Sequence, residues 1–360
     1  MASWRLLSTV LIAFAAILWA LTEKKSDYEG LNNNVTVTGP DPAFLEDEKE
    51  LSQAVFCPVP STPQAKETVL LVHGTGMTPQ INWEYTLVPP LIHDGFRPCY
   101  VAVPQRLLLD AQTSAEYISY AIKKLANESQ ISVVSWSAGA LATQWTLTFY
   151  PETRSKVRRH IALGPDFHGS WSMIPLLYFN MFTEAVVQQV PWANFVTALA
   201  RFGGNRALVP TTSIGSSTDL IVQPGFYGEA WPGFTDSWRL EGPQARNIDL
   251  FKLCAAKVLR QGGLPHIVSH DSLLWEPASH QIIFDALNNE ETYLGSADSV
   301  TADHCRGDRA DHLPPGSEAK HAAIMPELTR YASQMPSSGW PELPLRDYAS
   351  SLERFKGAPA

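Results

Sequence analysis

The sequence is poor in charge, and its charge balance is negative. Charged residues make up 18% of the 360 residues, whereas hydrophobic residues make up 45%. Soluble chains typically have about 25% charged residues, so this composition excludes an intrinsically disordered chain and predicts a large buried core. The formal net charge of −9 would repel an extended phosphate backbone. We therefore expect a globular protein without a nucleic-acid partner.

Cysteines are few, and none of them forms a C-x-x-C pair. They are Cys57, Cys99, Cys254 and Cys305. The sequence therefore gives no support for a metal site or a thioredoxin-like redox centre, and we expect neither a metal nor a cofactor. An even number of cysteines predicts two disulfides, and their spacing does not choose among the pairings.

The apolar run near the start of the chain is short. It extends from Leu6 to Leu21 and is followed by charged residues. Because a helix needs about 20 apolar residues to span a bilayer, we predict a secretory signal peptide over residues 1–21. The alternative is an uncleaved signal anchor, since Leu18 is larger than the residue usual near a cleavage site. Both alternatives send the chain into the secretory pathway, as a secreted or a membrane-anchored protein.

Residues 22–50 are polar and are expected to form a lead-in segment rather than core. Asn34 and Asn127 both begin N-x-S/T acceptor patterns, which predict N-glycosylation of surface loops in a secreted chain. Residues 51–360 are expected to form a single domain, because one α/β domain often exceeds about 250 residues.

Short apolar runs alternate with amphipathic stretches from residue 68 onward. The apolar runs predict buried strands over Thr68–His73, Cys99–Val103, Ile131–Trp136 and His160–Leu163. A helix capped by Ser114 is predicted between the second and third strands, and another over residues 138–150, ended by Pro151. This alternation predicts an α/β fold, with a mainly parallel sheet covered by helices on both faces. Reactive groups then belong at the carboxyl ends of the strands.

The sequence Ser135-Trp136-Ser137-Ala138-Gly139 lies where a predicted strand passes into a predicted helix. Small residues on either side of a central serine allow a tight turn that projects its hydroxyl, as in the G-x-S-x-G nucleophile turn. Ser135 takes the place of the first glycine and makes the turn more crowded. We identify Ser137 as the candidate nucleophile; the alternative is a serine that caps the helix.

The sequence His73-Gly74-Thr75-Gly76 closes the first predicted strand. In serine hydrolases of this architecture, the loop after that strand supplies one oxyanion donor, and the residue after the nucleophile supplies another. Thr75 and Ala138 are therefore the candidate oxyanion-hole residues. A plain glycine turn is the alternative.

The expected order along the chain is serine, acid and then histidine. Asp219 follows the strand-like stretch Thr211–Ile214 and a polar turn, so its carboxylate could point into the site. His270 lies in a polar loop, residues 269–272. Spacing alone leaves other acids and histidines open: Asp166, Asp236, Asp249, His266, His280, His304, His312 and His321.

Taken together, these segments resemble the Candida antarctica lipase B family in order and separation. The resemblance covers about residue 45 to about residue 350. It rests on Thr68–Gly76, Asn82–Cys99, Ser135–Gly139, Thr146–Val157, Gly164–Asp166, Val209–Thr212, Ser217–Pro224 and Pro265–Leu273. It implies an α/β-hydrolase fold and a serine hydrolase that acts on ester or lipid substrates.

The resemblance also implies residue roles. Ser137 would be the nucleophile, His270 the general base and Asp219 the orienting acid, with an oxyanion hole at Thr75 and Ala138. Residues implied to line the substrate site are Asp166, Gln189 and Ile221. The implied disulfides are Cys57–Cys99 and Cys254–Cys305, while a third bridge of the family, near the carboxyl terminus, has no cysteines here.

The sequence departs from the family around the expected substrate site. Leu220 is apolar where the family example has an acid, and Gly225–Trp238 is an aromatic insertion, so the substrate is not carried over. The apolar stretch Ser172–Phe182 would suit a lipid interface or a lid if it faces solvent, and core packing is the alternative.

The leading hypothesis is a secreted serine ester hydrolase, a lipase or carboxylesterase, that cleaves esters of apolar acyl chains through an acyl-enzyme. One alternative is an acyltransferase or lactone-forming enzyme with the same residues, because a pocket that excludes water favours transfer to an alcohol. Another is a non-catalytic binder of apolar ligands, against which the intact serine, histidine and aspartate argue. The sequence does not specify an oligomeric state.

Overall fold

The computed structural model describes residues 36–62, 64–127, 129–174, 183–225, 235–307, 309–334 and 341–350. Within these ranges the chain forms a seven-stranded sheet in the order β1-β3-β2-β4-β5-β6-β7. The strands are β1 (Val55–Phe56), β2 (Thr68–Val72), β3 (Arg97–Val101), β4 (Ile131–Trp136), β5 (Val157–Leu163), β6 (Thr211–Gly215) and β7 (Ala245–Asp249). β1 pairs antiparallel with β3, and the other neighbouring pairs are parallel. The prediction of a mainly parallel sheet is confirmed.

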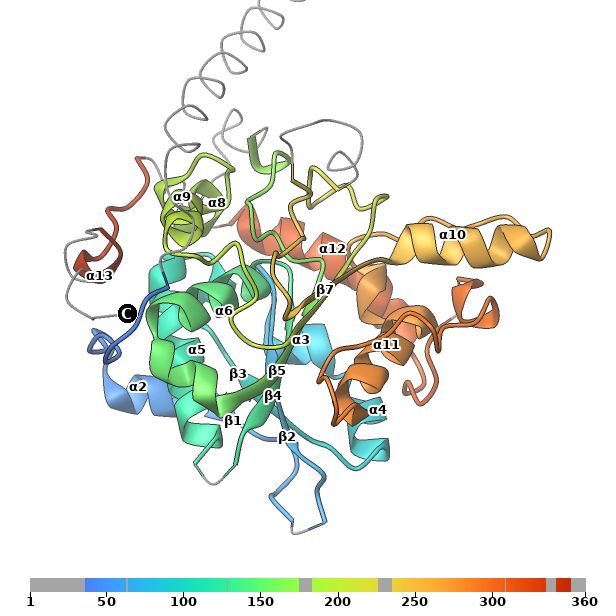
Figure 1. The fold of residues 1–360 in the computed structure, drawn as a ribbon, viewed down its shortest axis with the longest axis horizontal. Helices are drawn as coiled ribbons and strands as arrows, with labels where there is room; N and C mark the ends of the chain where they lie inside the picture. The colour runs from blue at the N-terminus through green and yellow to red at the C-terminus, as the bar shows by residue number, and fades with distance from the viewer. Residues whose placement is uncertain are drawn as a thin grey trace, which may run out of the picture.

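Helices cover both faces of this sheet (Figure 1). One face is packed by α2 (Glu48–Gln53), α5 (Ala111–Leu125) and α6 (Ala138–Phe149). The other is packed by α3 (Pro79–Trp83), α4 (Val88–His93), α10 (Leu250–Arg260), α11 (Pro277–Asn288) and α12 (Ser317–Ala332). The further helices are α8 (Glu184–Gln188), α9 (Asn194–Arg201) and α13 (Asp347–Ser350), with 3-10 turns η1 (Pro104–Leu107), η2 (Pro151–Lys156), η3 (Ser272–Leu274) and η4 (Asp303–Cys305).

The central strands are apolar because both of their faces are buried. Along β2, Leu70 packs into the core beneath α5 and α6, while Val69 and Leu71 pack into the opposite core. Every residue of β4 is buried. A parallel strand covered on both sides therefore reads as a continuous apolar run, which explains why the sequence located this strand correctly.

One predicted helix start is wrong. The helix expected to be capped by Ser114 begins a turn earlier, because the Asp110 carboxylate accepts a hydrogen bond from the backbone N–H of Gln112 and caps α5. Ser114 lies inside the helix, where its hydroxyl donates to the carbonyl of Asp110. A carboxylate next to the apolar stripe therefore competes successfully with a serine further along it.

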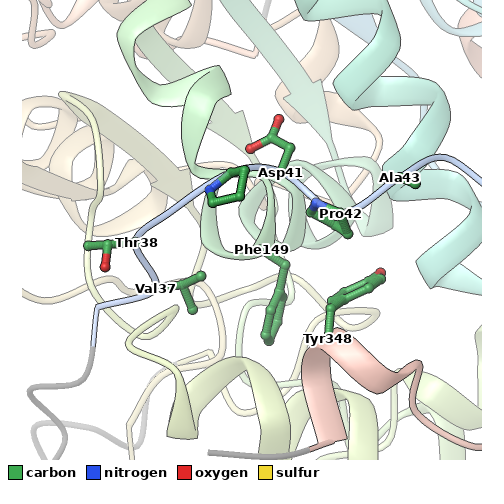
Figure 2. A pocket seen from close by; sticks show the side chains of 8 residues that line it. Val37, Thr38, Asp41, Pro42, Ala43, Phe149 and Tyr348 are labelled. Carbon is green, nitrogen blue, oxygen red and sulfur yellow. The ribbon is translucent and has the colours of Figure 1, made fainter. Parts of the chain in front are cut away.

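The described part of the expected lead-in, residues 36–50, is largely exposed but contacts the body of the protein at a few points. Val37 is buried, and it lines a pocket of about 350 Å³ together with Phe149 and Tyr348. Figure 2 shows how these three side chains lie. The buried Glu116 of α5 accepts the backbone N–H groups of Leu45 and Glu46, at 2.7 and 3.0 Å. The same carboxylate binds Arg346, just before α13. The polar composition of residues 36–50 gave no indication of these contacts with α5.

The structure joins Cys57 to Cys99 and Cys254 to Cys305, the pairing that the resemblance implies. Two disulfides fit an oxidising compartment. Among the described residues, no helix is both long and apolar enough to cross a bilayer. The predicted signal segment 1–21, Asn34 and residues 175–182 of the apolar stretch lie outside the described residues, as do residues 226–234 of the aromatic insertion. Asn127 is described, and it is exposed.

Candidate active site

Ser137 occupies the sharp turn between β4 and α6. Its backbone lies in the left-handed region, with φ 55° and ψ −136°, which non-glycine residues rarely adopt. Its N–H donates to the carbonyl of Leu163 on β5, at 2.9 Å between N and O. A Cβ on Gly139 would lie 2.3 Å from the carbonyl oxygen of His73, so only glycine lets α6 start this close to the loop after β2. The strained turn is therefore held by its surroundings and projects the serine hydroxyl at the carboxyl end of the sheet.

Three side chains from distant parts of the chain meet at this turn. The Nε2 atom of His270 lies 2.9 Å from Oγ of Ser137, and its Nδ1 lies 2.6 Å from Oδ2 of Asp219. Asp219 is fixed in turn because its other oxygen accepts the backbone N–H groups of Ile221 and Val222, at 2.7 and 3.0 Å. The acceptor carboxylate places the proton on Nδ1 and leaves Nε2 free to receive one from the serine. This arrangement can deprotonate a hydroxyl.

The charge around His270 favours its protonated form. Complete burial alone would lower the pKa of the imidazole, but the charge of Asp219 and its hydrogen bond outweigh that effect, with a further contribution from Asp166. The pKa of His270 is therefore raised from its ordinary value of 6.5. Asp219 would therefore stabilise an imidazolium that forms on His270 during a reaction.

Two segments next to Ser137 carry candidate oxyanion donors: the start of α6 and the loop after β2, where a Cβ on Gly74 would lie 3.0 Å from Cβ of Ser137. Ala138 is the first residue of α6, and the N–H groups of a helix's first turn have no acceptor inside the helix. The Oγ1 atom of Thr75 is buried and has no hydrogen-bond partner among the described residues. The amide of Asn82 in α3 holds this loop, because its Oδ1 accepts the backbone N–H of Gly74 at 2.9 Å. These donors could hold a developing oxyanion.

Asn82 had no assigned role in the sequence analysis. The signal was present, since Asn82 is a polar residue in a short stretch that also buries Pro79 and Trp83. Its buried side-chain oxygen finds a partner in the loop that carries Thr75, while its Nδ2 has none among the described residues.

Of the residues expected to line the substrate site, Asp166 and Ile221 lie beside this centre, while the Gln189 side chain donates to the carbonyl of Ala185. Asp166 is buried, and burial raises its carboxyl pKa from 3.8 to about 7. Its loop is linked to Gln189, whose carbonyl accepts the N–H of Ser170 at 2.7 Å. Ile221 sits beside the acid through its N–H bond to Asp219. The neighbouring Leu220 is 81% exposed and does not face the core.

The other candidate histidines and acids do not join the site. His266 pairs with Glu276 at 3.0 Å, and the Nε2 of His280 bonds to the carbonyl of Leu274. Four further candidates have partners of their own: Asp236 with Arg239, Asp249 with Lys252, His304 with Thr301, and His321 with the carbonyl of Tyr85. His312 stacks on His93. Within the described ranges, no group of three or more His, Cys, Asp or Glu side chains could hold a metal ion.

The sheet order, the turn at Ser137 and the hydrogen bonds joining it to His270 and Asp219 define a hydrolase of the α/β class. The chain is 31% identical to lipase B of Pseudozyma antarctica over 291 residues, which cover 80% of this chain and 81% of the relative. The crystal structure of Aspergillus fumigatus lipase B matches with a TM-score of 0.73 and 26% identity, over 89% of this chain and 76% of that one. No protein-family model matches the chain. The chain therefore belongs to the lipase B family, as the resemblance predicted, and is a carboxylic ester hydrolase.

Proposed function

We propose that the chain is a secreted lipase or carboxylesterase that cleaves esters of apolar acyl chains through a Ser137–His270–Asp219 triad. The supporting observation is the unbroken hydrogen-bond chain from Asp219 Oδ2 through the imidazole to Ser137 Oγ. A non-catalytic binder would have no use for a serine held in a strained turn against a base.

In the first half of the reaction, Nε2 of His270 takes the hydroxyl proton as Ser137 Oγ bonds to the ester carbonyl carbon. The carbonyl oxygen becomes negatively charged and receives hydrogen bonds from the N–H of Ala138 and from Thr75. Collapse of this intermediate breaks the bond to the alcohol oxygen, and the imidazolium of His270 gives that oxygen its proton. Asp219 stays ionised and stabilises the imidazolium.

In the second half, a water molecule replaces the alcohol. His270 takes one of its protons as the water oxygen attacks the acyl carbon, and the same two donors hold the oxyanion. The bond to Ser137 Oγ then breaks, and the proton returns from His270 to that oxygen. The carboxylic acid leaves and the enzyme is restored.

The test is covalent labelling followed by turnover. A fluorophosphonate should modify the folded wild-type chain at Ser137 and leave Ser137→Ala unlabelled. p-Nitrophenyl esters of rising acyl length should be hydrolysed with a clear length preference, and flat activity would contradict the proposed apolar acyl site. The proposal fails if the wild type is unlabelled or if Ser137→Ala still carries the adduct.

Adding an alcohol to the same assay tests the transferase alternative. A hydrolase should release mainly free acid, whereas an acyltransferase should release the new ester at alcohol concentrations far below that of water. Product analysis by chromatography separates the two outcomes.

The secretory part of the proposal rests on the N-terminal apolar run and the two acceptor patterns. Expression in a eukaryotic host should give a protein in the medium that begins after residue 21 and carries glycans at Asn34 and Asn127. Sequencing of the secreted N-terminus and glycosidase treatment measure both. Retention in the membrane fraction with residues 1–21 intact would instead favour the signal anchor.

A further inference from the structure

A second buried serine–histidine hydrogen bond lies next to the nucleophile. The Oγ of Ser135 on β4 is 2.6 Å from Nε2 of His160 on β5, and both side chains are fully buried. Ser135 stands two residues before Ser137, at the place that glycine usually takes in the nucleophile turn. A hydroxyl at that place adds bulk where the strand and helix approach each other. The proposed mechanism has not used this pair.

The His160 ring is suited to holding a hydroxyl and not to accepting a proton. Burial lowers its pKa to about 3, so the ring is neutral. Its Nδ1 has no hydrogen-bond partner within the described part of the chain, and no carboxylate stands behind it. The contact between Nε2 and Ser135 Oγ is therefore the hydrogen bond that the His160 ring forms among the described residues. Because a buried polar group without a partner is destabilising, this bond holds Ser135 and His160 together.

The next residue is held from the opposite side of the strand. The indole N–H of Trp136 donates to the carbonyl of His270 at 3.1 Å, and its ring lies against the imidazole, with 4.8 Å between ring centres. Successive side chains of a strand point to opposite faces. The backbone that enters the turn is thus fixed by His160 on one face and by the loop of His270 on the other.

We propose that His160 is a positioning residue for the nucleophile, which holds Ser135 so that the following turn presents Ser137 Oγ at hydrogen-bond distance from His270. This inference rests on the proposed function, since it concerns the reactivity of Ser137. His160 touches neither the substrate nor the reacting atoms and acts through the backbone of residues 135–137.

The size of the expected effect follows from the geometry of the attack. A displacement of about 1 Å at a reacting group can cost about 100-fold in rate, so release of one anchor by a few tenths of an ångström should cost about tenfold. The loss should fall on kcat, because Ser135 and His160 are buried below the turn and do not contact the substrate. KM should change by less than about twofold.

The test uses the full-length chain and the variants Ser135→Ala, His160→Leu, His160→Gln and the double variant Ser135→Ala/His160→Leu. Active sites are counted by fluorophosphonate labelling, and kcat and KM are measured per labelled site with a p-nitrophenyl ester. Each removal should lower kcat per labelled site about tenfold, and the double variant should lose no more than either single variant, since the two side chains act as one unit. His160→Gln keeps a hydrogen-bonding group and should recover part of the loss.

Ser132→Ala is the matched control. Ser132 is a buried serine on the same strand, and its hydroxyl donates to Glu67 Oε1 at 2.6 Å, at the end of β4 away from the turn. Its removal should lower the melting temperature and leave kcat per labelled site unchanged. A merely structural Ser135–His160 pair would behave in the same way.

Ser135→Gly covers the case in which the other variants fold poorly. Glycine restores the usual residue of the turn, so the variant should fold, and its kcat per labelled site should still fall about tenfold because the anchor is gone. The inference is overturned if this variant keeps wild-type kcat per labelled site, or if the losses of the single variants multiply in the double variant. Failure of the proposed function would instead appear in the wild type, as absence of labelling at Ser137.

Discussion

The two serine–histidine pairs at the end of β4 differ in what stands behind the histidine. Ser137–His270 and Ser135–His160 have similar atom separations, 2.9 and 2.6 Å, and both imidazoles are buried. Asp219 lies behind His270 and raises its pKa, whereas burial without a carboxylate lowers the pKa of His160 to about 3. A buried imidazole becomes a useful base only when a nearby anion stabilises its protonated form.

The largest difference between the pairs should appear when each serine loses its hydroxyl. Ser137→Ala removes the proposed nucleophile and should lower kcat by about 10⁶-fold, whereas Ser135→Ala removes only the proposed anchor. Steady-state assays with a p-nitrophenyl ester measure both, and circular dichroism controls for folding. Equal losses in the two variants would erase the distinction between chemistry and positioning.

Replacing the carboxylate should make the first pair resemble the second. Asp219→Asn keeps the shape of the side chain but removes the charge and allows the wrong imidazole tautomer, so kcat should fall by about 10⁴-fold. Fluorophosphonate labelling should slow in parallel. A loss of less than about tenfold would show that another group orients His270.

The loop after β2 should contribute less than the triad and more than the anchor. Thr75→Val removes the unpartnered hydroxyl and keeps the backbone and the branched shape, so kcat should fall by about 100-fold with little change in KM. Thr78→Val, which removes the hydroxyl that caps α3, serves as the control and should affect mainly stability. Unchanged kcat in Thr75→Val would mean that backbone N–H groups alone hold the oxyanion.

The smallest effect concerns the pH dependence. Protonated His270 cannot accept the serine proton, so activity should fall as the pH drops through its raised pKa, and the midpoint of the acid limb of kcat/KM should lie above 6.5. Asp166→Asn removes a carboxyl that helps to raise this pKa and should move the midpoint down by less than about one pH unit. His160→Leu should leave the midpoint in place. If His160→Leu shifted the midpoint, the acid limb could not be assigned to the titration of His270 alone.

The parts of this protein that could be predicted from the sequence are those with a repeated physical pattern. β4 matches its predicted bounds, because a strand buried on both faces is apolar throughout. α6 was located because the small-residue turn starts it and Pro151 follows its end. Helix α10 was not predicted because its apolar residues are not confined to one face: it buries Leu250, Cys254 and Val258 but exposes Leu259. Strand β7 was not predicted because it buries only Ile248 and so lacks an apolar run.

The site was predicted unevenly for a related reason. Ser137 has a local signal in its turn, and Asp219 has one in the strand-like stretch and polar turn before it, but the choice of His270 needed the family resemblance, since spacing allowed several histidines. His160 was included in an apolar strand without a role of its own. Its partner lies on the neighbouring strand, and the register that pairs Val133 with His160 is set by the whole sheet. No local pattern encodes such a contact.

The Glu116 carboxylate, which accepts from the backbone at residues 45 and 46 and also binds Arg346, brings these two distant segments together on α5. Val37 and Tyr348 line the same pocket, so in a chain trimmed to residues 36–350 a short glycine-rich linker could join the two new ends with little loop-closure entropy. Such a trimmed chain is suited to circular permutation, with new ends opened in an exposed loop such as residues 60–62. A fragment trimmed to begin at β1 would instead lose two donors to a buried carboxylate and should fold poorly.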